Sequence, residues 1–216
     1  MIKDGDIMNL HKMMEEQERL AKKILTSDSF DELNYVGACD MAFTLHDMIA
    51  SVVVLEYKSL DMVERKYAIQ PQRMPYKAGF RSYREAPIII EAFNMLRQKP
   101  DVMFVTGNGI LHPRRFGLAS HLGLALDVPT IGVAKKLLCG ELKDGKVIVD
   151  KEIRAVEVRT KPYAKPLYVS PGHRMSMKTA MKVFNEMLKK HKLPEPMKLA
   201  HRYANDVKKK IPEKEF

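Results

Sequence analysis

Apolar and polar positions follow two different periods along the chain, and these periods separate helices from strands. Over residues 8–25, apolar side chains recur at helical spacing with charge on the other side, which predicts an amphipathic helix. Residues 34–43, 48–57 and 60–69 are β-branched or alternate in polarity, and short polar turns join them. The first third of the chain therefore predicts one helix followed by three antiparallel strands.

The rest of the chain alternates between helical and strand patterns. The short apolar runs 102–105 and 130–134 predict buried strands, with one helix before them at 82–98 and another between them, ending near residue 127. Later patterns predict a hairpin over 140–159 with its turn at Asp144-Gly145, a strand at 166–169, and helices over 176–190 and 197–209.

This order of elements, three antiparallel strands followed by helix, strand, helix and strand, is typical of the ribonuclease H-like fold. We therefore expect an α/β protein with a mixed central sheet, three antiparallel strands plus parallel additions, flanked by helices. The pattern contains no repeat and no linker, so residues 1–216 are expected to form a single domain. Within it, the hairpin at about 141–160 is an insertion and a basic helix at about 197–210 is the last element.

The chain is strongly basic. It has 37 Lys and Arg against 27 Asp and Glu, a formal net charge of +10 and a pI near 9.5. This excess favours a polyanionic partner, nucleic acid first, although a solvated lysine-rich surface explains it equally well. No apolar run approaches the length of a membrane span, and residues 1–10 lack the pattern of a signal peptide. We therefore expect a cytoplasmic protein without a membrane partner, in which Cys39 and Cys139 are reduced.

Two carboxylates stand out from the pattern. Asp40 lies inside an otherwise apolar strand, and a buried carboxylate is costly unless it is paired or bound to a cation. Asp40 is therefore either a metal ligand or a strand-end residue hydrogen-bonded to a neighbouring loop. Glu85 has a structural explanation, because Ser82-x-x-Glu85 has the spacing of a helix capping box. Spacing alone favours the cap.

Three loops carry further candidate chemistry. Tyr76 lies in a basic loop over 70–80 that contains Pro and Gly, where its ring either stacks on bases or covers the core. Thr106-Gly107-Asn108-Gly109 follows a buried strand, and its glycines allow a tight turn or the close approach of a ligand. His173 precedes a predicted helix, where it is either close to a phosphate site or an ordinary surface residue.

Four segments resemble the endonuclease V family in order and spacing: YVGACDMAF, PYKAGFRSYREAP, GNGILHPRRFGLASHLGLALDVPTIGVAKKLLCG and PLYVSPGH. The resemblance extends over residues 35–203. It implies an endonuclease that recognises deoxyinosine in DNA, or inosine in RNA, and cuts the second phosphodiester bond on the 3′ side. It further implies a role in DNA repair and Mg²⁺ as the cofactor, with Mn²⁺ as a substitute. We expect the protein to be a monomer.

The resemblance gives catalytic roles to four residues. Asp40 corresponds to the metal-binding carboxylate on the first strand, and Glu85 to the one on the helix that follows the basic loop. Lys135 corresponds to a lysine placed near the scissile phosphate, and His173 to a histidine near the active centre. In this mechanism a metal-held water attacks phosphorus, while Lys135 and His173 assist through charge or proton transfer.

The resemblance also implies how substrate is held. Tyr76 corresponds to the aromatic wedge that fills the gap left by a base turned out of the duplex. His112 lies among residues that handle substrate, and backbone around Gly79, Gly107 and Gly117 lines a base pocket whose N–H and C=O groups read hypoxanthine. The phosphates would be held by basic residues, mainly Lys77, Arg114, Arg115 and the C-terminal lysines.

Thr106 departs from the family pattern, which has Asp-Gly-x-Gly where this chain has Thr-Gly-Asn-Gly. The missing Asp corresponds to the third acidic metal ligand. A neutral hydroxyl is a weaker ligand for a hard cation, so metal binding and cleavage are expected to be weaker. An alternative follows from the same residue: an inosine-binding protein that keeps the base pocket and has lost efficient cleavage.

Overall fold

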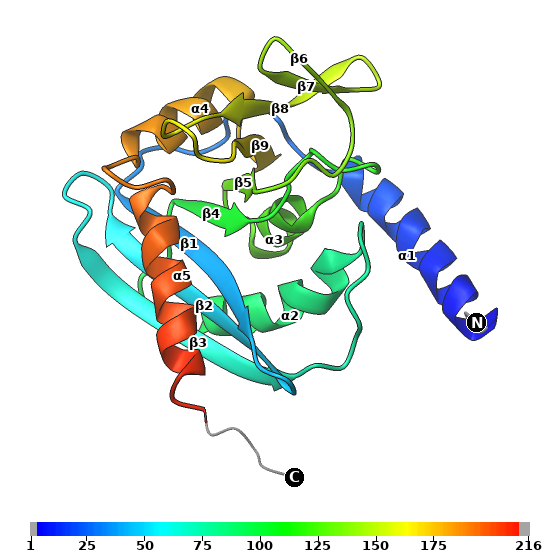
Figure 1. Cartoon of the computed structure of the whole chain (residues 1–216), viewed down its shortest axis with the longest axis horizontal. Helices are drawn as coiled ribbons and strands as arrows, with labels where there is room; N and C mark the ends of the chain where they lie inside the picture. The colour runs from blue at the N-terminus through cyan, green and yellow to red at the C-terminus, as the bar shows by residue number, and fades with distance from the viewer. Residues whose placement is uncertain (1–3, 212–216) are drawn as a thin grey trace.

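The computed structural model describes residues 4–211, and the side chains of residues 10–211. Its nine strands are β1 (Tyr35–Phe43), β2 (Asp47–Glu56), β3 (Met62–Pro71), β4 (Val102–Thr106), β5 (Thr130–Ala134), β6 (Glu141–Lys143), β7 (Lys146–Val149), β8 (Glu152–Val158) and β9 (Leu167–His173). They form one mixed sheet in the order β3-β2-β1-β4-β5-β9-β8-β7-β6 (Figure 1).

The strand directions confirm the expected mixed sheet. β1, β2 and β3 are an antiparallel meander, as the three early strand patterns predict. β4 and β5 are the parallel additions, because β4 pairs in parallel with both β1 and β5. β9 contains the strand predicted at 166–169 but extends to His173, and it pairs antiparallel with β5.

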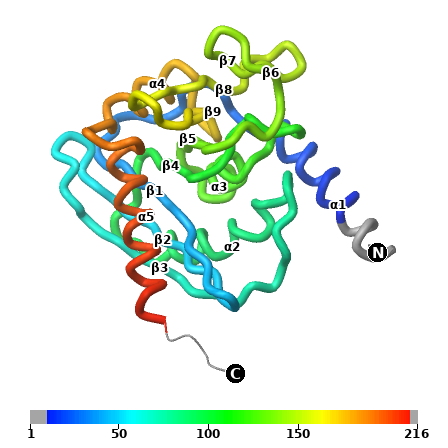
Figure 2. Tube along the Cα trace, viewed as in Figure 1, coloured from blue at the N-terminus to red at the C-terminus, as the bar shows by residue number. Residues whose placement is uncertain are grey.

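Helices cover both faces of the sheet (Figure 2). Side chains alternate along each strand, so Cys39 and Val105 pack against α2 and α3, whereas Ala38 and Phe104 pack against α4 and α5. The long helix α1 lies beside the sheet, next to the loop that precedes α2 (Figure 1). The helices are α1 (Asp4–Ala21), α2 (Arg81–Asn94), α3 (Leu118–Leu126), α4 (Met177–Glu186) and α5 (Glu195–Lys208).

The segment predicted as a hairpin insertion is larger than a hairpin. Its first turn is at Asp144 and Gly145, as predicted, because Lys143 pairs with Lys146 across it. A second turn then adds β8, which pairs with β9 and joins the whole segment to the main sheet.

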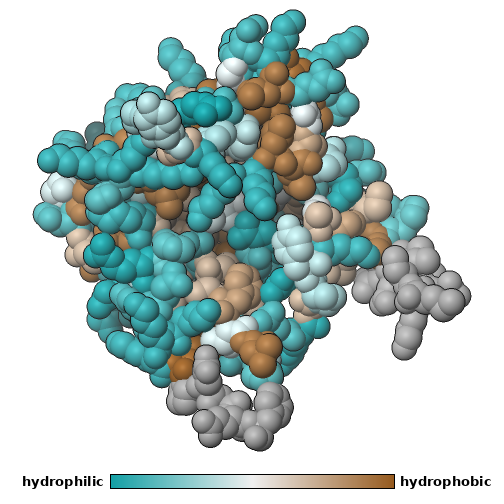
Figure 3. Space-filling model, viewed as in Figure 1, coloured by the Kyte–Doolittle hydropathy of each residue, from teal (hydrophilic) through white to brown (hydrophobic). Residues whose placement is uncertain are grey.

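The face seen in Figure 3 is mainly hydrophilic, with an apolar strip beside the β6–β7 hairpin.

The predicted capping box at Ser82 is wrong. Helix α2 begins at Arg81 and its N-cap is Phe80, which makes no side-chain cap. Ser82 is therefore inside the helix, where its hydroxyl is buried and has no hydrogen-bond partner among the described residues. Glu85 instead pairs with Arg81, one turn earlier. The helix also ends at Asn94, four residues before the predicted end.

The structure also describes the two cysteines and the length and polarity of the helices. Cys39 is buried and free, and Cys139 is half-buried and free, as expected of reduced thiols. None of the described helices is both long and apolar enough to cross a membrane.

Candidate functional site

Asp40 and Thr106 lie side by side where two parallel strands end. Cys39 of β1 pairs with Val105 of β4, so the next residue of each strand, Asp40 and Thr106, occupy adjacent positions. Strands are about 4.8 Å apart, and the two-residue period puts both side chains on the face that α5 covers. The structure thus brings the first carboxylate and the substituted third position together, although Asp40 itself is only 6% exposed.

His201 is a residue that the sequence patterns did not single out. It lies on α5, and its Nδ1 is 2.7 Å from Oδ2 of Asp40. The helix can approach β1 and β2 closely because Ala200 and Ala204 are small, and the Ser51 hydroxyl donates a hydrogen bond to the Ala200 carbonyl at 2.8 Å. A carboxylate that orients a half-exposed imidazole is an arrangement able to accept a proton from water.

Glu85 reaches the same region from the opposite face of the sheet and is held there by Arg81. Nε of Arg81 donates to Oε2 of Glu85 at 2.8 Å, and the Glu85 side chain is only 2% exposed. Burial of Arg81 lowers the pKa of its guanidinium, but the charge of Glu85 and then that of Asp40 raise this pKa above its ordinary value. Both carboxylates therefore act on one arginine.

These residues do not fit the divalent cation that the family resemblance implies. Thr106 offers a neutral hydroxyl, the Glu85 carboxylate is already paired with Arg81, and Asp40 is paired with His201. Mg²⁺ prefers charged or strongly polar oxygen ligands in octahedral geometry. Within residues 4–211, no group of three or more His, Cys, Asp or Glu side chains has an arrangement that could hold a metal ion.

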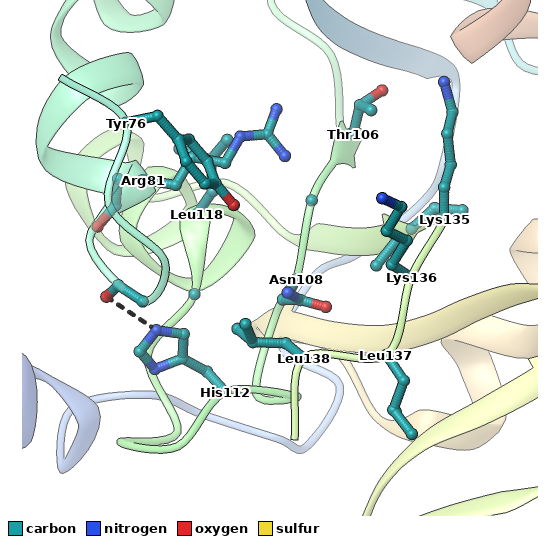
Figure 4. A pocket seen from close by; sticks show the side chains of 16 residues that line it. Tyr76, Arg81, Thr106, Asn108, His112, Leu118, Lys135, Lys136, Leu137 and Leu138 are labelled. Atoms are coloured by element: carbon teal, nitrogen blue, oxygen red, sulfur yellow. Dashed lines mark hydrogen bonds between the residues drawn. The ribbon is translucent and has the colours of Figure 1, made fainter. Parts of the chain in front are cut away.

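A cavity of about 350 Å³ opens beside this cluster, which is within the size range of ligand pockets. It brings together most of the residues that the sequence marks as substrate-binding, along with several that it does not. Its wall includes Tyr76, Gly79, Gly107, His112, Gly117 and Lys135 from the predicted set, and Arg81, Thr106, Asn108 and Lys136 (Figure 4).

His112 supports the cavity wall by holding the carbonyl of Gly79. Nε2 of His112 lies 3.1 Å from that carbonyl, which also accepts hydrogen bonds from Gln17 and Arg114. Nδ1 accepts from the backbone N–H of Arg114, so the two ring nitrogens are used as the neutral Nε2–H tautomer requires. Burial, and then the nearby charge of Arg114, lower the pKa of His112 to about 4.

Replacing His112 with Gln is expected to remove part of the acid sensitivity of the fold. The folded pKa, about 4, is below the ordinary value of 6.5, so between these two pH values only the unfolded chain binds the proton. The contribution of neutral His112 to the free energy of unfolding is therefore fully present above pH 6.5 and is lost as the pH is lowered. Urea unfolding at pH 7 and pH 4.5 gives the free energy of unfolding that each protein loses between these two pH values. The variant should lose about 2 kcal/mol less than the natural chain.

The control is His191→Gln, at an exposed position outside the site. This variant should retain the full pH dependence. Equal pH dependence in the His112 variant and the natural chain would contradict the buried, neutral state of His112.

The remaining cavity residues differ in exposure and in whether their polar atoms are hydrogen-bonded within the protein. The Tyr76 ring is 64% exposed, so it is free to contact a ligand at the cavity mouth. Oδ1 of Asn108 is buried and has no hydrogen-bond partner among the described residues. An unpaired buried acceptor costs about 1–3 kcal/mol. A donor on a bound ligand would recover that cost.

The structure separates His173 from this cluster. His173 is the last residue of β9 and pairs with Thr130, at the start of β5, whereas Thr106 pairs with Val133 near its end. The two sites are thus about 10 Å apart along β5. His173 is 4% exposed and accepts a hydrogen bond from the backbone N–H of Leu25, so it is not an ordinary surface residue. The catalytic role that the resemblance implies for it stays a prediction.

The comparison with protein families gives the same answer as the four motifs. A family model described as Endonuclease V matches residues 18–202. The chain belongs to the endonuclease V family. Among its relatives, the endonuclease V of Dictyoglomus thermophilum is 43% identical over 197 residues, which are 87% of this chain and 86% of that protein. The endonuclease V of Rippkaea orientalis is 40% identical over 200 residues, with 88% and 87% covered.

Solved structures of endonuclease V confirm the expected ribonuclease H-like fold. The catalytic domain of human endonuclease V has a TM-score of 0.84 and 30% identity, with 94% of this chain and 96% of that chain covered. Endonuclease V of Ciona intestinalis, in complex with a 24mer DNA containing an inosine followed by a ribo-adenosine, has a TM-score of 0.85 and 29% identity, with 94% and 99% covered. Endonuclease V family members are nucleases, which act on phosphodiester bonds.

Proposed function

We propose that this chain recognises deoxyinosine in DNA, or inosine in RNA, and cleaves the second phosphodiester bond 3′ to it, at a rate weakened by Thr106. The observation that carries the proposal is that one cavity is lined both by Gly79, Gly107 and Gly117 and by Thr106, which belongs to the cluster of polar groups at the ends of β1 and β4. If the base occupies this cavity, the sugar-phosphate backbone of its strand lies against the polar groups at the strand ends. The inosine-containing DNA bound by the Ciona intestinalis relative supports the same substrate class.

The cavity supports recognition of a neutral base. Its wall includes Gly79, Gly107 and Gly117, whose backbone groups can donate and accept hydrogen bonds without bringing a charge. The carbonyl of Gly79 already accepts three hydrogen bonds from protein donors, so it serves to fix the wall. The unpaired Oδ1 of Asn108 is the acceptor left for the N1–H of hypoxanthine, which adenine lacks.

The basic residues expected at the phosphates differ in how far the protein already engages them. Arg115 makes a bidentate pair with Glu152, and Arg114 bonds Gln17 and Gly79, so both are engaged within the protein. Lys135 and Lys136 instead lie on the cavity wall, next to Thr106 (Figure 4). They are the lysines placed to hold the phosphates beside the base.

The proposal is tested on a labelled duplex with one deoxyinosine and a matched RNA with one inosine. Each is incubated without metal, with Mg²⁺ and with Mn²⁺, because the family resemblance implies a metal requirement whereas Asp40 and Glu85 are paired within the protein. The expected result is a slow single cut one nucleotide beyond the inosine. Equal binding and cutting of matched adenosine substrates would overturn the proposal.

Tyr76→Ala tests the wedge assignment. We expect the variant to bind inosine-containing duplex about tenfold more weakly, because an aromatic stacked on a base contributes about 1–3 kcal/mol. Its folding stability should not change, since the ring is 64% exposed. Tyr163→Ala is the matched control, because Tyr163 is fully exposed and does not line the cavity. Equal weakening in both variants would assign the loss to general surface effects.

A second candidate function is inosine binding without efficient cleavage. Thr106 and the Arg81–Glu85 pair favour it, because they remove one acidic group and engage another. In the same assay, tight inosine-dependent binding without any cut identifies this function. Thus the two candidates share the recognition step and differ only in the chemistry at the strand ends.

A further inference from the structure

Only part of the Arg81 guanidinium is hydrogen-bonded within the protein. Its Nε donates to Glu85, but among the described residues its two terminal nitrogens have no protein acceptor. The side chain is 31% exposed, so these nitrogens are open to the cavity. A guanidinium with one edge fixed and the other free is prepared to bind a planar or tetrahedral anion.

The free edge of Arg81 faces the strand ends. Nη1 lies 3.3 Å from the position that a Cβ on Gly107 would occupy, so the guanidinium lies against the residue that follows Thr106. Figure 4 shows it directed toward Thr106, with Lys135 and Lys136 on the other side of that strand. Three cationic side chains therefore line the same cavity as Thr106.

The charge of Arg81 also balances the acidic groups of the site. Glu85 is bonded to it directly and Asp40 is close enough to act on its charge. A divalent cation that used Oε2 of Glu85 would have to displace the Arg81 guanidinium from it, at a side chain that is only 2% exposed. Breaking an ion pair at a buried carboxylate is costly, because the remaining charge is left unpaired.

We propose that Arg81 takes the place of a divalent cation in this chain: it holds Glu85 and binds a phosphate of the inosine-containing strand, so that binding needs no added metal. The inference rests on the proposed function, because it assigns the phosphate next to the recognised base to Arg81. It concerns how the strand is held, and it stands whether or not the strand is then cut.

Arg81→Met tests the phosphate contact in solution. Binding of the deoxyinosine duplex is measured by fluorescence anisotropy in EDTA and in Mg²⁺, over a range of salt concentrations. The natural chain should bind equally well in both. The variant should bind tenfold or more weakly, and its slope of log K against log salt should fall by about 0.9, as expected for one lost contact with B-DNA phosphate. Arg81→Lys should lose less, because it keeps the charge.

Arg97→Met is the matched control. Arg97 is exposed and follows the far end of α2, about 20 Å from Arg81 along the helix axis. The same loss of charge there should leave binding and the salt slope unchanged. If Arg81→Met folds poorly because Glu85 is left unpaired, the double variant Arg81→Met/Glu85→Gln removes both charges and is measured in the same way.

Mn²⁺ binding, followed by electron paramagnetic resonance without nucleic acid, gives an independent readout. Arg81→Met should gain Mn²⁺ affinity about tenfold or more over the natural chain, because Glu85 is released. Two results overturn the inference: natural-chain binding of the inosine duplex that requires Mg²⁺, or an Arg81→Met variant with unchanged salt slope and Mn²⁺ affinity. The proposed function fails separately, if the natural chain does not prefer inosine to adenosine.

Discussion

Cleavage of a deoxyinosine duplex by the double variant Thr106→Asp/Arg81→Met is expected to be about a hundredfold or more faster than by the natural chain in Mg²⁺. Thr106 and Asp40 are adjacent on one face of the sheet, so the substitution at Thr106 places two carboxylates together. Removing Arg81 frees Glu85 as a third. Three carboxylates provide the charged oxygens that a hard cation prefers. Initial rates at saturating enzyme measure the gain.

The single variants separate the two changes. With Arg81 present, the carboxylate introduced by Thr106→Asp has a guanidinium beside it, so this variant alone should gain much less than the double variant. The control is Thr26→Asp, which adds the same charge next to Leu25, whose backbone N–H donates a hydrogen bond to His173 at the end of β9. A full gain from Thr106→Asp alone would show that Arg81 does not block the site. No gain in either variant would contradict the role assigned to position 106.

The parts of the fold that the sequence predicts are those that depend on local periodicity. The antiparallel meander, the two parallel strands and the helices between them have apolar patterns long enough to decide their type. The extent of the sheet beyond β5 was not predictable in the same way. Pro171 and Gly172 resemble a turn, yet they lie within β9, where Gly172 packs directly against Ala119 and Thr130. That contact joins residues far apart in the sequence, and no local pattern reports it.

The site shows the same limit. Asp40 is conspicuous in the sequence because it interrupts an apolar strand, whereas its partner His201 is 161 residues away on an ordinary amphipathic helix. Only the packing of α5 on β1 brings the two together. The pairing of Arg81 with Glu85 was hidden by the Ser82 capping spacing, which a helix start at Arg81 makes irrelevant. The family motifs thus indicated the cavity residues, but neither the motifs nor the local patterns indicated the charges that balance them.

Gly132→Ala is expected to destabilise the fold by about 3 kcal/mol, which is a large effect for one methyl group. Gly132 is in the middle of β5, directly beneath the loop that follows β4. A Cβ there would lie 2.4 Å from the backbone nitrogen of Gly109 and 2.8 Å from the carbonyl oxygen of Gly107. Backbone atoms cannot rotate away, so the loop or the strand must shift. Thermal unfolding should show a Tm lower by about 10 °C.

Gly145→Ala is the control, at the tip of the β6–β7 hairpin. Nothing lies within 4 Å of a Cβ at this position, so only its backbone angle of φ +73° opposes the substitution. Its cost should therefore be about 1 kcal/mol. Because the loop above Gly132 carries Gly107 and Asn108 of the cavity wall, Gly132→Ala should also weaken inosine binding, which Gly145→Ala should not. A Gly132→Ala variant with unchanged stability would mean that the glycine is not required for the close approach of this loop, and that the position of the cavity wall depends on other contacts.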